Sequence, residues 1–120
     1  MLDILVIDDD PIVTRMLSRV LSSHVVQVAN TGRGALERLS QQSFDLILCD
    51  LTMPGMSGIE LYRAIRESSA DVAERVVFMT GGAYTTEGHE FLAQLPNSWL
   101  EKPFDLSALK AVARQRSLEL

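Results

Sequence analysis

The chain has 120 residues, 47% of them hydrophobic, which is enough for one domain with a core of its own. We therefore expect a single domain over residues 1–120. Eleven basic and sixteen acidic residues give a net charge of −5, which argues against direct binding to nucleic acid or an anionic membrane and favours cations as ligands. The chain starts without a basic leader and has no apolar run near the ~20 residues that span a bilayer, so we expect a soluble, cytoplasmic protein.

Apolar residues alternate between strand-like and helix-like patterns along the chain. Unbroken apolar runs at 4–7 and 46–49 are too short for buried helices and are typical of parallel strands covered on both faces. Strands are predicted at 4–7, 25–29, 46–50, 75–80 and 98–101. Helices are predicted at about 11–22, 33–41, 58–67 and 85–95, and from 106 onward. Residues 68–74 are interpreted as the exit from the third helix.

The predicted helices carry capping residues and apolar stripes. Asp10 and Asp105 stand where N-caps are expected, and Pro11 suits a first helical position. The stripe of the first helix that is expected to face the core consists of Ile12, Val13, Met16, Leu17, Val20 and Leu21. In the last helix it consists of Leu106, Leu109, Val112 and Ala113. The helix at 85–95 is the weakest because Gly88 lies inside it, and we expect it to be mobile.

Strands that alternate with helices through short joints predict an α/β fold. Right-handed crossovers then give a doubly wound five-stranded parallel sheet, a three-layer sandwich with a flavodoxin-like strand order. In this order the first and third strands are neighbours, and both run into acids at the carboxyl edge, where ligands bind in open α/β sheets. We expect Asp8, Asp9 and Asp50 to converge there. Thr80 and Lys102 are expected close by.

Three carboxylates at one edge are electrostatically costly. Two like charges about 4 Å apart repel by roughly 4 kcal/mol at an effective dielectric constant near 20, so the cluster should bind a cation or raise a pKa. Oxygen ligands without histidine or thiolate select a hard cation, and Mg²⁺ fits best. The sequence therefore predicts a magnesium site formed by Asp8, Asp9 and Asp50.

Other chemistries find less support in the sequence. Cys49, the single cysteine, lies inside an apolar strand, so it is interpreted as a buried structural thiol. His89 begins a zinc-protease pattern, but Ala93 stands where the second histidine is required. The run at 55–58 is one residue short of a nucleophile elbow, and no glycine-rich loop is followed by the lysine of a nucleotide-binding motif. The hydrolase and nucleotidase interpretations are therefore both weakened.

Five separated features occur in order along the chain. They are the acids after Ile7, Asp50 at a strand end, the Met-Pro-Gly-Met-Ser-Gly run at 53–58, Thr80-Gly81, and Lys102-Pro103-Phe104. Together they resemble the receiver domain of two-component response regulators, and the resemblance covers the whole chain. The loop at 81–84 and the run at 100–104 further resemble receivers fused to hybrid sensor histidine kinases.

The resemblance implies that Asp50 is a phosphoacceptor, which attacks the phosphoryl group of a phosphohistidine and forms an aspartyl phosphate. It implies Mg²⁺ as the cofactor, with Asp9 as the chief ligand and Asp8 acting through water. Asp50 and the main-chain carbonyl of Thr52 would complete the protein's share. Catalysis would then consist mostly of positioning and charge neutralisation.

The resemblance also implies how the phosphate is bound. Lys102 would pair with Asp50 and then with a phosphate oxygen. The Thr80 hydroxyl, the Gly81 amide and Thr52 would contact the phosphate as well.

Further residues are implied to govern switching and phosphate lifetime. Trp99 would form the switch together with Thr80, in the place of the family's tyrosine or phenylalanine. A cis peptide before Pro103 would hold the preceding lysine in its pocket. Thr52 and Gly82 stand at positions that tune phosphate lifetime in this family, so that lifetime stays open.

The implied partner is a sensor histidine kinase or a histidine phosphotransfer protein. A homodimer or partner face is expected on the helix at 85–95, the strand at 98–101 and the last helix. The implied domain is not an enzyme, although it would assist its own phosphorylation and dephosphorylation. We expect either a stand-alone regulator or a module of a longer protein such as a hybrid histidine kinase.

Two alternatives belong to other classes of protein. A pseudo-receiver would keep the fold as an interaction module without being phosphorylated, but the intact acids, Thr80 and Lys102 argue against it. A metal-dependent phosphatase would use Asp50 on small substrates, but it would need a second acid just beyond the nucleophile, where Thr52 stands.

Overall fold

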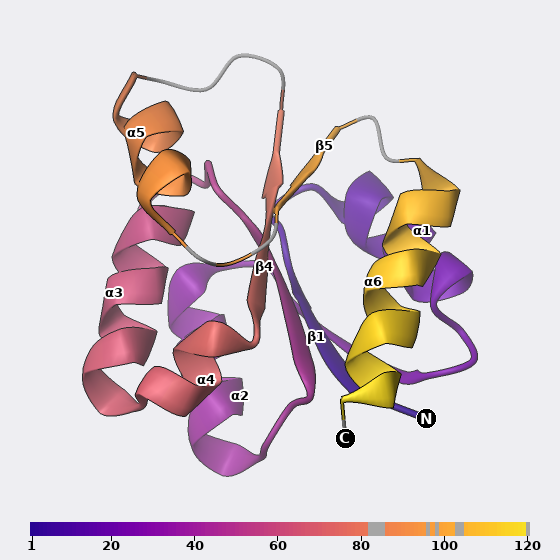
Figure 1. Cartoon of the computed structure of the whole chain (residues 1–120). Coiled ribbons are helices and arrows are strands. Elements are labelled where there is room, and N and C mark those ends of the chain that lie inside the picture. Colours follow the sequence, from indigo (N-terminus) through magenta and orange to yellow (C-terminus); the bar gives the residue numbers. More distant parts are fainter. Residues whose placement is uncertain (82–85, 96, 98, 103–104, 120) are drawn as a thin grey trace.

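The computed structural model describes residues 1–81, 86–95, 97, 99–102 and 105–119. Figure 1 shows strands and helices alternating along the chain. The strands are β1 (Asp3–Ile7), β2 (Val25–Ala29), β3 (Leu46–Asp50), β4 (Val76–Thr80) and β5 (Trp99–Glu101). The helices are α1 (Pro11–Val20), α2 (Gly32–Gln41), α3 (Gly58–Ser68), α4 (Ala70–Glu74), α5 (Thr86–Gln94) and α6 (Leu106–Leu118).

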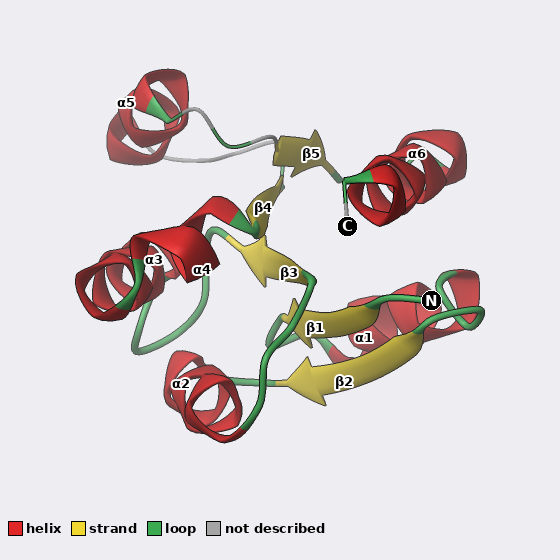
Figure 2. Ribbon diagram, turned by 60° about the horizontal axis from the view of Figure 1, so that its bottom comes forward, coloured by secondary structure: helices red, strands yellow, loops and turns green. Residues whose placement is uncertain are grey.

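The five strands form one parallel sheet in the order β2-β1-β3-β4-β5. Helices α2, α3, α4 and α5 lie on one face of this sheet, and α1 and α6 lie on the other (Figure 2). The predicted fold class, a doubly wound flavodoxin-like sandwich, is therefore confirmed. Its strand order makes β1 and β3 neighbours, with Ile7 beside Cys49 in the register.

Each face of the sheet has its own hydrophobic core. On the α1 and α6 side, Ile4, Val6 and Leu48 of the strands pack with Leu17 of α1 and Leu109 of α6. On the opposite side, Leu5, Ile7 and Phe78 of the strands pack against α2, α3 and α5. Along each strand, these residues alternate with those that face α1 and α6. Because the central strands are buried on both faces, they read as unbroken apolar runs in the sequence.

The caps that the sequence predicts at α1 and α6 are present. The carboxylate of Asp10 accepts a hydrogen bond from the Ile12 amide at 2.9 Å, and Pro11 is the first residue of α1. The carboxylate of Asp105 accepts from the Ser107 amide at 2.9 Å. These bonds satisfy amides that no earlier turn of the helix could satisfy.

Three residues that were expected to face the core are exposed instead. Ile12 is 74% exposed, Leu106 is 48% exposed and Met16 is 36% exposed. Ile12 and Leu106 stand in the first turns of their helices, which begin beside the carboxyl edge of the sheet. The periodic pattern continues there beyond the surface that the strands can cover, so the expectation of burial was wrong for Ile12 and Leu106, and it was wrong for Met16 as well.

A short helix, α4, occupies the segment that the sequence analysis interprets as the exit from the third helix. Ser69 ends α3, because its amide bonds to the Ile65 carbonyl, and it also caps α4, because its hydroxyl accepts a hydrogen bond from the Val72 amide. Five residues are too few to show helical periodicity, so the pattern could not reveal this element. The helix expected at 85–95 is therefore α5, and the last helix is α6.

Helix α5 is held by few buried residues. Leu92 is buried, and Phe91 makes edge-on ring contacts with Tyr62 and Phe78 at centroid distances of 5.6 and 5.4 Å. The expected mobility of this helix stays a prediction. Across the described residues, none of the helices combines the length and the apolar character required to cross a bilayer.

Candidate functional site

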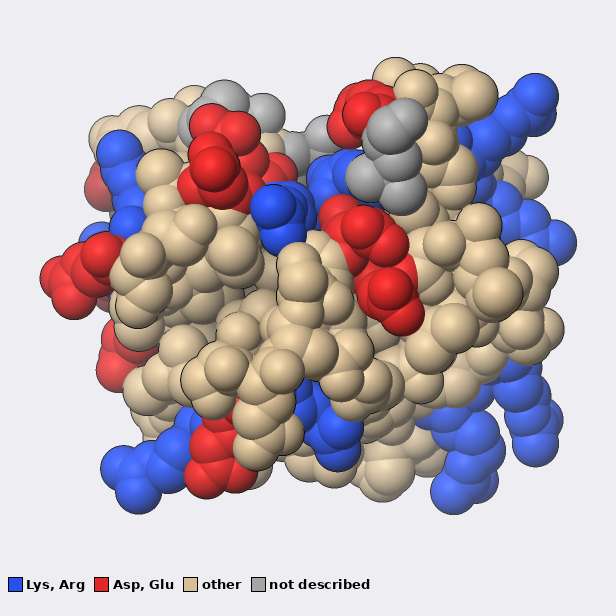
Figure 3. All heavy atoms as spheres, turned by 90° about the horizontal axis from the view of Figure 1, so that it is seen from below, with Lys and Arg blue, Asp and Glu red and all other residues tan. Residues whose placement is uncertain are grey.

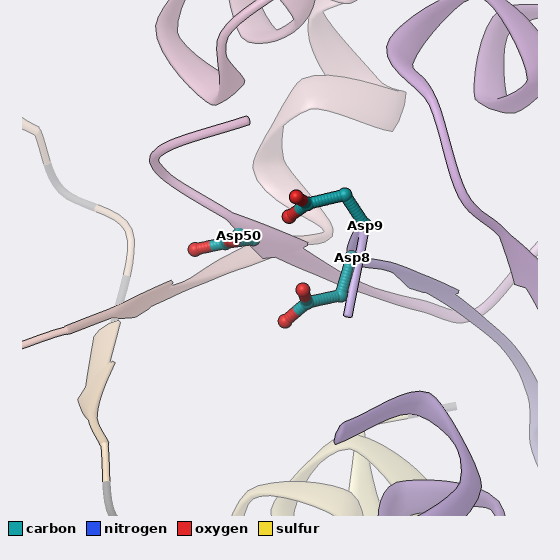
Figure 4. A group of neighbouring side chains, drawn as sticks. All are labelled: Asp8, Asp9 and Asp50. Carbon is teal, nitrogen blue, oxygen red and sulfur yellow. The ribbon is translucent and has the colours of Figure 1, made fainter. Parts of the chain in front are cut away.

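Three carboxylates meet at the carboxyl edge of the sheet (Figure 4). Asp8 and Asp9 directly follow β1, and Asp50 is the last residue of β3. One carboxylate oxygen from each lies within 4.8 Å of the others. The predicted convergence of these acids is therefore present, and it follows from the pairing of two neighbouring parallel strands.

Asp8 is the fixed member of this cluster. It is fully buried, and its Oδ1 accepts a hydrogen bond from the Asp10 amide at 2.9 Å. Its Oδ2 accepts one from the Lys102 ammonium, also at 2.9 Å. Both oxygens of this buried carboxylate therefore accept a hydrogen bond, one of them from a charged donor. Asp9, in contrast, is exposed and open to an incoming ligand.

Lys102 lies between the two buried acids. Its Nζ is 2.9 Å from Asp8 Oδ2 and 3.5 Å from Asp50 Oδ1. The sequence analysis pairs this lysine with Asp50, whereas the structure shows the shorter contact to Asp8. Burial by itself lowers the pKa of Lys102, but the hydrogen bond to Asp8 and the charge of Asp50 outweigh it and raise that pKa. The lysine is therefore a stable cation at neutral pH.

The surroundings of Asp50 disfavour the ionised form of its carboxyl group. Burial, followed by repulsion from Asp8, raises its pKa from 3.8 to about 6, although Lys102 and the Thr52 amide act in the opposite direction. The Thr52 amide donates to Asp50 Oδ1 at 3.4 Å. Any additional positive charge at this edge would therefore stabilise the ionised form of Asp50.

Thr80, the last residue of β4, also lies at the carboxyl edge of the sheet. It is 1% exposed, and its Oγ1 has no hydrogen-bond partner among the described residues. Gly81 follows it with open space around its α-carbon, since a Cβ there would meet no atom of the described residues within 4 Å. A buried hydroxyl without a partner beside open space is a ready donor for an oxygen-rich ligand.

The predicted switch residue Trp99 lies on β5, next to β4. Trp99 lies opposite Phe78 in the β4–β5 register and is 39% exposed. Its proposed movement and the role of the Thr52 carbonyl stay predictions. Gly82 and the peptide before Pro103 lie outside the described residues.

Gly58 is a residue of the site that the sequence analysis did not single out for this role. Its amide donates to the Leu51 carbonyl at 3.0 Å. A Cβ on Gly58 would overlap the Asp50 carbonyl oxygen and would lie 2.8 Å from Leu51 Cα. Only a glycine lets α3 begin so close to the phosphoacceptor candidate, and the signal in the sequence was the pair of glycines at 55 and 58.

The donor set of this edge fits a hard divalent cation. It consists of carboxylate oxygens from Asp8, Asp9 and Asp50, with no histidine in the cluster. The Cys49 thiol is buried, and burial together with the charge of Asp50 raises its pKa, so it does not compete as a thiolate. Mg²⁺ prefers a few carboxylates and keeps water in its remaining positions, which suits a cluster with one exposed acid.

Comparison with known proteins gives a consistent result. The sequence model of the response regulator receiver domain matches residues 4–114. Sensor histidine kinase RcsC of Salmonella typhi is 38% identical over 109 residues, which are 89% of this chain and 11% of that protein. Transcriptional regulatory protein ZraR of Escherichia coli K12 is 37% identical over 112 residues, which are 92% of this chain and 25% of that protein. The chain thus spans only a tenth to a quarter of the length of these relatives.

Among solved structures, response regulator protein TrrA from Thermotoga maritima was determined in complex with Mg²⁺ and BeF. It is 27% identical, with a TM-score of 0.82, and the match covers 97% of this chain and 99% of that one. The CheY4 chemotaxis protein of Vibrio cholerae is 26% identical with a TM-score of 0.81, over 96% of this chain and 98% of that one.

Proposed function

Since the chain belongs to the response regulator receiver family, we propose that Asp50 accepts the phosphoryl group in a two-component phosphorelay. The donor is a phosphohistidine on a sensor histidine kinase or on a histidine phosphotransfer protein. The observation that carries the proposal is the position of Asp50 beside Asp8 and Lys102, where burial and a neighbouring acid raise its pKa.

The transfer is a substitution at phosphorus. A carboxylate oxygen of Asp50 attacks, the P–N bond to the imidazole breaks, and the bonding electron pair leaves with the histidine nitrogen. Both contacts from Lys102 Nζ and the Thr52 amide go to Asp50 Oδ1, so Oδ2 has no such partner within the described part of the chain and is the attacking oxygen. The product is an aspartyl phosphate.

The charges of the site are arranged for this anionic reaction. Mg²⁺, when bound by Asp8, Asp9 and Asp50, supplies positive charge that offsets the charge of the phosphoryl oxygens. Lys102 contributes a fixed cation 3.5 Å from Asp50 Oδ1. Asp8 orients that lysine through its 2.9 Å contact, and the exposed Asp9 gives the cation an entry route.

Thr80 and Gly81 bind the phosphoryl oxygens in this proposal. The unpaired Thr80 hydroxyl donates to one oxygen, and the Gly81 amide donates to another. The carboxyl end of β4 is thereby drawn toward Asp50. The surface of α5, β5 and α6 then changes, and it serves as the face for a partner or a second copy, with Trp99 as its switch residue.

The test is phosphorylation by acetyl phosphate or by a phosphorylated histidine kinase, with and without Mg²⁺, followed by intact mass spectrometry. One base-labile phosphoryl group is expected in the wild type and none in Asp50→Asn. Glu67→Gln, which changes an exposed carboxylate of α3, is the matched control and should be labelled like the wild type. Undiminished labelling of Asp50→Asn would exclude Asp50 as the acceptor, and absence of labelling in every variant would favour a pseudo-receiver.

A further inference from the structure

Basic residues are distributed unevenly over the molecule. Helices α1 and α6, which share one face of the sheet (Figure 2), hold five of the eleven Lys and Arg residues and none of the sixteen Asp and Glu residues. Figure 3 shows two groups of Lys and Arg on the side of these helices, with uncharged surface between them. A protein with a net charge of −5 therefore carries a cationic face.

The fold accounts for one of these five residues. Arg116 donates hydrogen bonds to the carbonyl oxygens of Asp45 at 2.7 Å and Arg75 at 3.2 Å, and it pairs with Glu119. It therefore ties the end of α6 to the amino ends of the strands.

The other four basic residues have no such role. Within the part of the chain that the structure describes, no acid lies within 4.0 Å of the exposed side chains of Arg15, Arg19, Lys110 and Arg114. Each helix carries two of them four residues apart, on one side of the helix, and like charges at this spacing destabilise a helix. Arg19 stands in the last turn of α1, where a cation is favourable, but the other three do not gain from a helix end. Folding alone does not explain them.

A groove of about 570 Å³ separates the two helices near the amino edge of the sheet. The buried Leu21 and Ala113 give it apolar surface, and the exposed Lys110 and Arg114 line it from α6. His24 Nδ1 accepts a hydrogen bond from the Leu2 amide at 3.0 Å, which leaves the other ring nitrogen of this lining residue as a donor. The groove thus combines apolar area with donors and cations.

We propose that this groove binds an acidic, amphipathic segment of a partner protein. Carboxylates of the segment pair with Lys110 and Arg114, and its apolar side chains cover Leu21 and Ala113. Mixed apolar and charged surface is typical of protein interfaces. Nucleic acid and anionic lipid fit less well, because an extended polyanion would also meet the acids that make the rest of the chain negative.

The groove opens at the end of the sheet opposite Asp50. It is lined by the turn between α1 and β2, which precedes the amino end of β2, whereas Asp50 ends β3 at the carboxyl edge. A segment bound there leaves the phosphoacceptor accessible. The proposal therefore goes beyond phosphoryl transfer and does not depend on it.

The test uses a fluorescein-labelled helical peptide with Glu at i, i+4 spacing and Leu on the opposite face, and a matched peptide with Gln in place of Glu. We expect the Glu peptide to bind the full chain, with chemical-shift changes in ¹⁵N NMR spectra confined to α1, α6 and residues 21–24. The double variant Lys110→Gln/Arg114→Gln should bind it about tenfold more weakly, and added salt should weaken wild-type binding. The control Arg63→Gln/Arg66→Gln, on the exposed side of α3, should bind like the wild type.

Several results would overturn the proposal. They are equal affinity for the Glu and Gln peptides, equal affinity of the Lys110→Gln/Arg114→Gln variant, or shifts that map outside the groove. Tighter binding to duplex DNA or to phosphatidylserine vesicles than to the Glu peptide would identify a polyanion site instead. Labelling of Asp50 by acetyl phosphate should be unchanged in the double variant, which shows that it is folded and separates this test from that of the phosphoryl transfer.

Discussion

Replacement of Asp50 by Asn should stabilise the metal-free protein at neutral and alkaline pH. Asp50 is 5% exposed, and burial together with Asp8 raises its pKa from 3.8 to about 6. A rise of this size corresponds to about 3 kcal/mol of unfavourable free energy for the ionised carboxylate in the folded chain. Asn removes that charge at nearly constant volume, although it also loses the contact with Lys102. We expect a gain of about 2–3 kcal/mol, or roughly 10 °C in Tm for a domain of this size.

The pH dependence has a defined sign and window. Between about pH 4 and pH 6 the folded wild type binds more protons than its unfolded chain, because the folded pKa is the higher one. The stability of the wild type therefore rises relative to Asp50→Asn as the pH falls through 6. The advantage of the variant is complete above that pKa and is lost near the unfolded value of 3.8.

Thermal unfolding followed by circular dichroism in EDTA, at about pH 8 and about pH 4.5, measures this difference. Glu67→Gln removes an exposed carboxylate and should stay within about 0.5 kcal/mol of the wild type at both pH values. Mg²⁺ at about pH 8 should stabilise the wild type more than Asp50→Asn and so narrow the gap. If Asp50→Asn has the same Tm as the wild type at about pH 8, or keeps the same advantage at about pH 4.5, the folded chain does not raise the pKa of Asp50 and the reasoning is refuted.

Three further predictions concern other parts of the site. Asp9→Asn should abolish the Mg²⁺-induced change in the fluorescence of Trp99, and a titration identical to that of the wild type would place the metal elsewhere. Gly58→Ala should lower the stability to urea by about 1–3 kcal/mol and slow the labelling of Asp50, because its Cβ would overlap the Asp50 main chain, whereas Gly81→Ala has open space and should cost little stability. Beryllofluoride with Mg²⁺ should change hydrogen exchange in α5 and β5, and changes confined to α3 would mean that another surface carries the signal.

The sequence was sufficient for the fold and for the position of the acids. Strands buried on both faces leave unbroken apolar runs, and each of the runs ending at Ile7 and Cys49 is followed by an acid. The strand order then places Asp8 and Asp50 side by side without any knowledge of side-chain contacts. Both steps depend on local patterns and on general rules for parallel sheets.

The details that the sequence did not reveal depend on distances between separate elements. Whether Lys102 lies nearer Asp8 or Asp50 is decided by where β5 ends relative to β1 and β3. The need for glycine at position 58 arises from the close approach of α3 to the Asp50 main chain. The exposure of Ile12 and Leu106 depends on how far the sheet extends beneath α1 and α6. Periodicity indicates which side of a helix is apolar, but it does not indicate where the sheet beneath the helix ends.

The unpaired hydroxyl of Thr80 connects the chemistry of the site to its conformation. A buried donor without a partner costs about 1–3 kcal/mol, and Thr80 Oγ1 is such a group among the described residues. A phosphoryl oxygen on Asp50 would satisfy it, so the phosphorylated state gains free energy that the unmodified state lacks. The main chain transmits this gain, because the Thr80 carbonyl accepts the Lys102 amide at 2.7 Å and thereby joins β4 to the end of β5. We therefore expect movement of Thr80 toward Asp50 to shift both strand ends together, and the edge strand β5 to carry the change to the surface where Trp99 is exposed.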